Sequence, residues 1–293
     1  MIQVTDLSKV YSNGKGVFDL DFQVAEGEVF GFLGPNGAGK TTTIRMLLGF
    51  TNPTKGKSSI NGLDARTKTE DIQKFLGYVP GEIAFFDNMT GTEFLDFMKR
   101  MRGSNGNSRQ KELIDLLELE TKGRIRKMSK GMKQKLGLVA AFMHDPSVLI
   151  LDEPTSGLDP LMQKRFIELI LQEKKRGKTI LMSSHLFDEV ERTCERTAII
   201  REGVIVAKER IDELKKTLKK SYIVTFEDVS DVERIKNSPL DYKLLDDRKV
   251  EIQIEEDYQT MLSVLSNCKV ADLDAQKKTL EDIFIKYYSK EDA

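Results

Sequence analysis

The sequence predicts an α/β fold: a mainly parallel sheet with an antiparallel β subdomain and a helical insertion, joined to a small α+β domain. Short apolar runs alternate with segments of helical periodicity over the first 211 residues, as in a parallel sheet covered by helices. Residues 92–144 carry successive helical patterns that interrupt this alternation, and the composition shifts beyond about residue 212. We therefore expect two domains, 1–211 with a helical insertion at about 87–144, and 212–293.

The elements of the first domain follow from the spacing of its apolar residues. Two β-like runs flank the turn-forming segment 12–16 and predict an N-terminal hairpin. Strands are expected at 2–4, 17–22, 28–33, 58–63, 75–79, 148–151, 179–182 and 197–200. Helices outside the insertion are expected at 41–50, 160–176 and 186–194. Within the insertion, a Gly/Ser/Asn run at 103–108 separates the first two of its helices.

The second domain reads as a β-α-β-β-α-β unit, which is the ferredoxin-like order, followed by a terminal helix. Its strands are expected at 222–226, 242–245, 250–254 and 270–275, and its helices at 232–237, 258–266 and 279–288. The basic segment 214–220 before it is interpreted as a solvated linker helix, with a membrane-facing basic helix as the alternative.

Composition narrows the classes of protein. Lys and Arg number 46 against 47 Asp and Glu, so a net charge of −1 gives no global basic field, and we expect no nucleic acid partner. The two cysteines, Cys194 and Cys268, have no Cys/His pairing near them, which excludes a zinc site and favours the reducing cytosol over a disulfide scaffold. No signal peptide is visible and no run approaches 18 apolar residues, so a cytoplasmic chain without its own membrane span is expected.

Residues 34–42, Gly-Pro-Asn-Gly-Ala-Gly-Lys-Thr-Thr, fit the pattern G-x-x-x-x-G-K-[ST] between a predicted strand and a predicted helix. The glycines allow a sharp turn close to a polyphosphate, and the amides at the helix N-terminus donate to it. Lys40 can reach the β and γ phosphates, and the Thr41 hydroxyl can bind Mg²⁺. The predicted nucleotide-binding residues are Gly34, Pro35, Asn36, Gly37, Ala38, Gly39, Lys40, Thr41 and Thr42. This loop predicts a nucleoside triphosphate ligand.

Two further strands end in residues suited to hydrolysis. Asp152 and Glu153 follow an apolar strand, so both are expected at the carboxyl edge of the sheet, where ligands bind. Asp152 fits a Mg²⁺ ligand, and Glu153 is then free to act as the general base on water. His185 ends a neighbouring strand and can reach a γ-phosphate or orient the water. His144, at the end of a predicted helix, is interpreted as structural.

A second helix start resembles an anion site. Ser129 is a suitable N-cap, and Gly131 leaves the backbone exposed within Met128-Ser-Lys-Gly-Met132. From the residues alone, ordinary helix capping stays open as the alternative.

Together these motifs, with Leu149-Ile-Leu-Asp-Glu-Pro154 and Ser156-Gly-Leu-Asp159, resemble the ABC ATPase family over roughly residues 1–210. The resemblance implies a P-loop NTPase core of ABC type. It implies that Ser129 and Gly131 belong to the signature motif, which binds the γ-phosphate of ATP held by an opposing subunit. It further implies that Asp159 lies in the D-loop at the dimer interface and that Tyr11 stacks on adenine.

Two departures from the family pattern stand out. The signature reads Met-Ser-Lys-Gly-Met in place of Leu-Ser-Gly-Gly-Gln, although Ser129 and Gly131 are retained. The Q-loop glutamine is expected after Tyr78-Val-Pro80, but Gly81 stands there with Glu82 next. Glu82 is therefore a further candidate metal ligand, with a solvated loop residue as the alternative.

The resulting hypothesis is an ATPase with catalytic residues Lys40, Glu153 and His185 and cofactors ATP and Mg²⁺. The resemblance is greatest to ATPase subunits of ABC-2-type exporters. It implies transmembrane permease subunits and a second ATPase subunit, identical or paralogous, as partners, and a peripheral location on the inner face of the cell membrane. An importer, or a soluble ABC ATPase acting on ribosomes or DNA, is the alternative.

Overall fold

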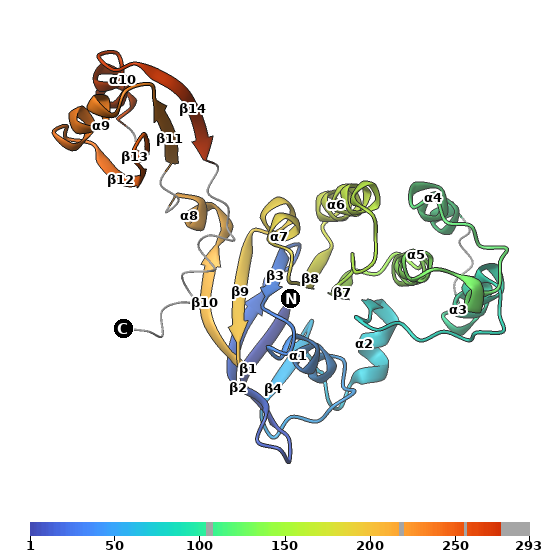
Figure 1. The fold of residues 1–293 in the computed structure, drawn as a ribbon. Helices are drawn as coiled ribbons and strands as arrows, with labels where there is room; N and C mark the ends of the chain where they lie inside the picture. Colours follow the sequence, from blue (N-terminus) through green and yellow to red (C-terminus); the bar gives the residue numbers. More distant parts are fainter. Residues whose placement is uncertain (104–107, 217–219, 255–256, 277–293) are drawn as a thin grey trace. The chain divides into compact units, whose positions relative to one another are not determined.

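The computed structural model describes residues 1–103, 108–216, 220–254 and 257–276 and is drawn in Figure 1. The chain divides into two compact units, Met1–Ile211 and Asp212–Ala293. Each is described separately below.

A six-stranded sheet forms the centre of the first unit. Its strands are β3 (Val29–Leu33), β6 (Leu76–Val79), β7 (Val148–Asp152), β8 (Thr179–Ser184), β9 (Arg196–Arg201) and β10 (Val204–Arg210). They lie in the order β10-β9-β3-β8-β7-β6, and all neighbours pair in parallel except β9 and β10. The predicted parallel sheet is confirmed, whereas β10 was not predicted because most of its residues are exposed at the sheet edge.

A four-stranded antiparallel sheet lies beside it. It contains β1 (Ile2–Val10), β2 (Gly16–Val24), β4 (Lys55–Ile60) and β5 (Leu63–Asp64) in the order β2-β1-β4-β5. The N-terminal hairpin is confirmed. The single strand expected at 58–63 is wrong: Asn61 and Gly62 both adopt positive φ, 49° and 77°, and turn the chain between β4 and β5.

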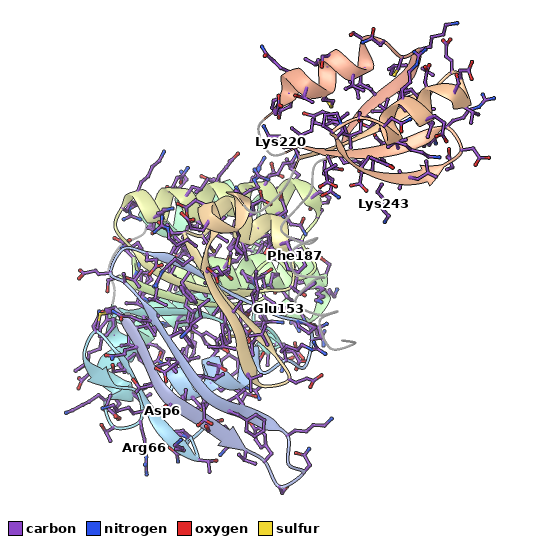
Figure 2. All side chains as sticks on the ribbon, turned by 90° about the vertical axis from the view of Figure 1, so that its left-hand side faces the viewer. Asp6, Arg66, Glu153, Phe187, Lys220 and Lys243 are labelled. Carbon is purple, nitrogen blue, oxygen red and sulfur yellow. The ribbon has the colours of Figure 1, made fainter. Side chains whose placement is uncertain are left out.

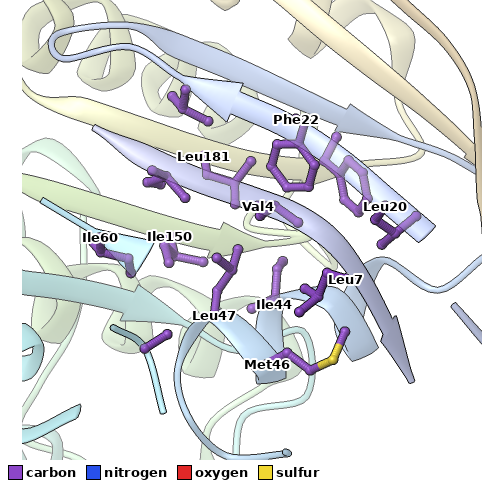
Figure 3. Packing of buried hydrophobic residues seen from close by; sticks show 14 of the residues in the cluster. Val4, Leu7, Leu20, Phe22, Ile44, Met46, Leu47, Ile60, Ile150 and Leu181 are labelled. Carbon is purple, nitrogen blue, oxygen red and sulfur yellow. The ribbon is translucent and has the colours of Figure 1, made fainter. Parts of the chain in front are cut away.

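Helix α1 (Lys40–Leu47) packs between the two sheets and contacts β2, β4 and β7. Figure 3 shows Ile44 and Leu47 among the side chains of Leu7 and Ile150, all fully buried. Burial of each such side chain stabilises the fold by about 1.5–3 kcal/mol. The packing fixes the helix whose first residues follow the phosphate loop.

The remaining helices of this unit cover the sheet or form the insertion. Helices α6 (Pro160–Lys175) and α7 (Phe187–Thr193) contact each other, and α7 packs on β3 and β8. The insertion contains the three expected helices, α3 (Gly91–Met101), α4 (Ser108–Leu116) and α5 (Lys130–Phe142), and also the 3₁₀ turn η1 (Ile125–Lys127), which was not predicted. The short helix α2 (Thr69–Phe75) was not predicted, because it buries only Ile72 and carries little apolar periodicity.

The second unit has the predicted ferredoxin-like topology. Its described elements are β11 (Lys220–Phe226), α9 (Val229–Lys236), β12 (Asp241–Asp246), β13 (Lys249–Ile254), α10 (Tyr258–Leu265) and β14 (Val270–Gln276). The strands lie antiparallel in the order β12-β13-β11-β14, and one apolar cluster joins β11, β13 and β14 to both helices. The linker helix α8 spans Ile211–Lys216, and the helix expected over 214–220 is wrong at Lys220, which begins β11; residues 217–219 lie outside the described part of the chain. The helix expected at 279–288 lies outside the described residues.

Among the described residues, no helix combines the length and the apolar character that spanning a bilayer requires.

Candidate nucleotide site

The loop between β3 and α1 adopts a conformation that only glycine tolerates at several positions. Gly37 and Gly39 have φ values of 81° and 114°, in the left-handed region. A Cβ on Gly34 would lie 2.4 Å from the carbonyl oxygen of Ile200, and one on Gly39 would lie 2.4 Å from Val17 Cγ1. Both shape and packing therefore require the glycines that the motif predicted.

Lys40 is directed back into this loop. Its side chain is only 5% exposed, and Nζ donates to the carbonyl oxygens of Gly34 at 2.7 Å and Pro35 at 3.2 Å. The same Nζ lies 3.0 Å from Glu153 Oε1. The structure thus joins the loop lysine to the acid predicted as general base, at the point where phosphate groups would enter the loop.

Asp152 is held by two hydroxyl groups at the carboxyl edge of the sheet. Its Oδ2 accepts a hydrogen bond from Thr41 Oγ1 at 2.7 Å, and its Oδ1 accepts one from the Ser183 hydroxyl. The carboxylate is fully buried. Carboxylate and hydroxyl oxygens are suitable ligands for Mg²⁺, which commonly keeps waters and substrate phosphates as its other ligands. The described residues contain no group of three His, Cys, Asp or Glu side chains that could hold a metal ion.

Glu153 and His185 form a pair beside the loop. Glu153 has a positive φ of 48°, and its amide donates to the Ser183 carbonyl at 3.2 Å and hydroxyl at 3.1 Å. His185 Nδ1 lies 2.6 Å from Glu153 Oε2. Their side chains are 18% and 45% exposed, so a reacting water can approach them. Figure 2 labels Glu153, together with Phe187 at the start of α7.

Gly203 is a supporting residue that sequence reasoning missed. It occupies the β9–β10 turn with a φ of 84°, and its amide donates to the Ala38 carbonyl in the phosphate loop at 3.0 Å. Its own carbonyl accepts from the Phe18 amide at 2.8 Å, and a Cβ would lie 2.3 Å from the Gly16 oxygen. The signal in the sequence was the Glu202-Gly203 pair between two apolar runs, which marks a tight turn.

The signature segment begins helix α5 at an exposed N-terminus. Ser129 caps the helix, accepting from the Met132 amide at 3.2 Å, and is exposed. A Cβ on Gly131 would lie 2.8 Å from the Gly157 carbonyl oxygen. The buried Gln134, also missed from the sequence, donates to the Pro154 carbonyl at 2.7 Å. Helix α5 is therefore attached to the segment that follows Glu153.

Three predicted site residues make no described contact with the residues around the phosphate loop. Tyr11 is 41% exposed at the β1–β2 turn, with Lys9 Nζ 5.7 Å from its ring centroid. Asp159 caps α6 through the Leu161 and Met162 amides, and these hydrogen bonds, that of Met162 first, lower the pKa of its carboxyl. Glu82 is exposed.

Gly81, which follows β6, lies close to the Asp152 carboxylate. A Cβ at position 81 would lie 3.3 Å from Asp152 Oδ2. The loop therefore approaches Asp152 through backbone, at the position where the family pattern has a glutamine.

His144 has the structural environment that was predicted. Its Nε2 lies 3.1 Å from the Leu76 carbonyl oxygen of β6, just beyond the end of α5. Burial, followed by the charge of Arg102, lowers the pKa of this histidine to about 4. A neutral imidazole therefore ties the end of α5 to the sheet.

Comparisons with known proteins agree with this geometry. The family described as ABC transporter matches residues 17–156. The bacitracin transport ATP-binding protein BcrA of Bacillus licheniformis is 40% identical over 223 residues, 75% of this chain and 73% of that protein. The Nod factor export ATP-binding protein I of Rhizobium etli is 39% identical over 226 residues, 73% of this chain and 70% of its own length.

A solved structure, the ATP-binding subunit of an ABC transporter, is 32% identical and superposes with a TM-score of 0.67, covering 74% of this chain and 92% of that one. The phosphate loop, the acidic residues at the end of β7 and the fold thus agree with the sequence similarity, which extends over most of this chain and of each similar protein. The chain belongs to the ABC transporter ATP-binding proteins, and it binds ATP and hydrolyses it.

Proposed function

We propose that this chain powers a membrane exporter, in which two ATPase subunits dock on transmembrane permease subunits at the inner face of the membrane. Export is favoured by the similarity to the Nod factor export ATP-binding protein, which is 39% identical over 226 residues. The observation that carries the two-subunit arrangement is the exposed N-terminus of α5, where Ser129 caps the helix.

Hydrolysis follows from the groups around the loop. Lys40 exchanges its contacts with Gly34, Pro35 and Glu153 for phosphate oxygens, neutralising their charge. Glu153, released from Lys40, accepts a proton from the attacking water. His185, 2.6 Å from Glu153, orients that carboxylate and reaches toward the γ-phosphate.

Thr41 and Asp152 are the proposed Mg²⁺ ligands, since their oxygens meet at 2.7 Å at the loop. Bound there, Mg²⁺ neutralises charge on the phosphate oxygens. Glu82 remains a further candidate ligand. Chelation of Mg²⁺ should abolish hydrolysis, and Asp152→Asn should raise the Mg²⁺ concentration required. Unchanged Mg²⁺ dependence in that variant would remove Asp152 from this role.

The second subunit completes the site. The Ser129 hydroxyl and the amides near Gly131, at the N-terminus of α5, provide donors to the γ-phosphate of ATP bound by the opposing chain. Asp159, at the start of α6, is proposed to lie at this interface, and Tyr11 to stack on adenine of the ATP in its own chain.

The membrane assignment is tested by affinity purification of the tagged chain from detergent-solubilised membranes. We expect a polytopic membrane protein to co-purify and to stimulate ATP hydrolysis, with Glu153→Gln retaining the partner but not the activity. Recovery of activity only with ribosomes or DNA would contradict the proposal.

Direction is tested with bacitracin as the probe, because the BcrA relative is named for its transport. Cells carrying the wild-type chain with its permease should accumulate less of the peptide than cells carrying Glu153→Gln. Greater accumulation with the wild-type chain would indicate import.

A further inference from the structure

Glu189 is a buried carboxylate that does not belong to the predicted nucleotide site. It lies in the first turn of α7, and it is only 3% exposed. Burial raises the pKa of this carboxyl, while two hydroxyl hydrogen bonds oppose that effect. A buried carboxylate is costly unless it is well hydrogen-bonded, so its partners indicate what it does.

Those partners come from two different segments of the chain. Glu189 Oε1 accepts from the Thr155 hydroxyl, and Oε2 accepts from Ser184 Oγ at 3.0 Å. Both hydroxyl residues are themselves buried, at 3% and 2% exposure. One carboxylate therefore joins the segment after β7 to the end of β8.

Each partner stands next to a residue of the proposed reaction. Thr155 lies two residues after Glu153, and Ser184 directly precedes His185. Ser184 Oγ also accepts from the Leu186 amide at 2.9 Å, so the hydroxyl fixes the backbone on both sides of His185. The separation of Glu153 and His185 thus depends on how Glu189 holds the two segments.

We propose that Glu189 is a positioning residue for ATP hydrolysis, holding the loops of Glu153 and His185 so that the two side chains keep their contact. The inference rests on the proposed roles of Glu153 and His185. Glu189 is buried, and its carboxylate accepts hydrogen bonds from the Thr155 and Ser184 hydroxyls, so we infer that it acts through these groups.

The test is a graded series at position 189 in the full chain, followed by kcat, KM and the affinity for a fluorescent ATP analogue. Glu189→Gln keeps one acceptor oxygen, and Glu189→Met keeps the length without any acceptor of comparable strength. We expect kcat to fall about 5-fold in the first and about 30-fold or more in the second, with KM and affinity within about twofold.

Thr155→Val and Ser184→Ala each remove one hydroxyl with little change of shape, and each should lower kcat in the same way. Combining Thr155→Val with Glu189→Met should lower kcat no further than Glu189→Met alone, because both remove the same hydrogen bond. The matched control is Asp188→Asn on the same helix, where the 76% exposed carboxylate pairs only loosely with Arg192 at 3.4 Å. It should retain wild-type kcat.

Wild-type kcat in folded Glu189→Gln and Thr155→Val, or an equal loss of ATP affinity and kcat, would overturn the proposal. If Glu189→Met does not fold, Thr155→Val and Ser184→Ala decide the outcome. A Glu153→Gln variant measured in parallel distinguishes failure of the proposed base from failure of the positioning role. Full activity of Glu153→Gln would remove the base role itself. An inactive Glu153→Gln beside fully active Glu189 variants would remove only the positioning role of Glu189.

Discussion

The phosphate loop and the N-terminus of α5 present the same kind of anion-binding backbone in opposite settings. In the loop, Lys40 is buried and makes three polar contacts, and Thr41 is bonded to a fully buried Asp152. At the start of α5, Ser129 is exposed and bonds only within its own helix turn in the contacts described. The contacts around the loop are all made within this chain, whereas the proposed role of the exposed cap is to donate to a ligand held by a second chain.

This difference in burial predicts which substitutions change hydrolysis through contacts within one chain and which change it through contacts between two chains. Removing one member of a buried ion pair leaves a buried charge without its partner, and that penalty is large. Changing an exposed cap affects local helix stability by about 1 kcal/mol. A large effect on hydrolysis from an exposed cap would therefore require a second chain.

The largest effect is expected from Glu153→Gln. The amide cannot accept the proton from water, so kcat should fall about 100-fold or more while ATP affinity stays within about threefold. Glu70→Gln, an exposed substitution at the start of α2, is the control. Steady-state ATPase assays and equilibrium nucleotide binding measure both quantities. Hydrolysis at the wild-type rate would show that another group serves as the base.

An intermediate effect is expected from Ser129→Asp, which preserves the N-cap of α5 but adds a negative charge. Hydrolysis should fall about 10-fold or more through repulsion of the opposing γ-phosphate, whereas ATP binding to the single chain should not change. Ser129→Asn keeps the cap without the charge and is the matched control. Its hydrolysis should lie within about threefold of wild type.

Mixing the Ser129→Asp and Glu153→Gln chains sharpens this comparison. In a mixed dimer, one site would carry both substitutions, and the other would carry neither. Activity should therefore exceed that of either variant alone. An inactive mixture of chains that do associate would contradict a site shared between subunits.

The smallest effect is expected at the far end of α5, where the pKa of His144 is lowered to about 4 by burial. The unfolded chain binds this proton near pH 6.5, so the stabilisation is complete above that pH and is lost as the pH falls toward 4. Between pH 7 and pH 5 the free energy of unfolding should fall by at most about 2 kcal/mol from this group. His144→Gln cannot titrate and should lack this part of the pH dependence, as measured by urea unfolding.

Most of the architecture was accessible from the sequence because its signals are local. Apolar runs identified the buried parallel strands, and loop glycines identified the phosphate loop. The errors occurred where a turn interrupted an apolar run or where the apolar pattern was weak: Asn61-Gly62 divides a predicted strand, β10 is largely exposed, and α2 buries only Ile72.

The interior of the site was less predictable, since its contacts join residues distant in the chain. Nothing near Lys40 indicates that its ammonium meets Glu153, and nothing near Glu189 indicates Thr155 as a partner. Gly203 likewise reaches Ala38 only because β9 pairs with β3. Such contacts depend on sheet order, which local periodicity does not specify.

The close approach of Gly131 to Gly157 explains which residues of the signature motif can be replaced. A side chain at position 131 would collide with the Gly157 carbonyl oxygen at 2.8 Å, so only hydrogen fits there. Lys130 is exposed and Met128 fills a buried apolar space, so neither meets the same steric barrier. The sequence Met-Ser-Lys-Gly-Met thus retains glycine at position 131, where a side chain would collide with the backbone, and differs from the family pattern at the neighbouring buried Met128 and exposed Lys130.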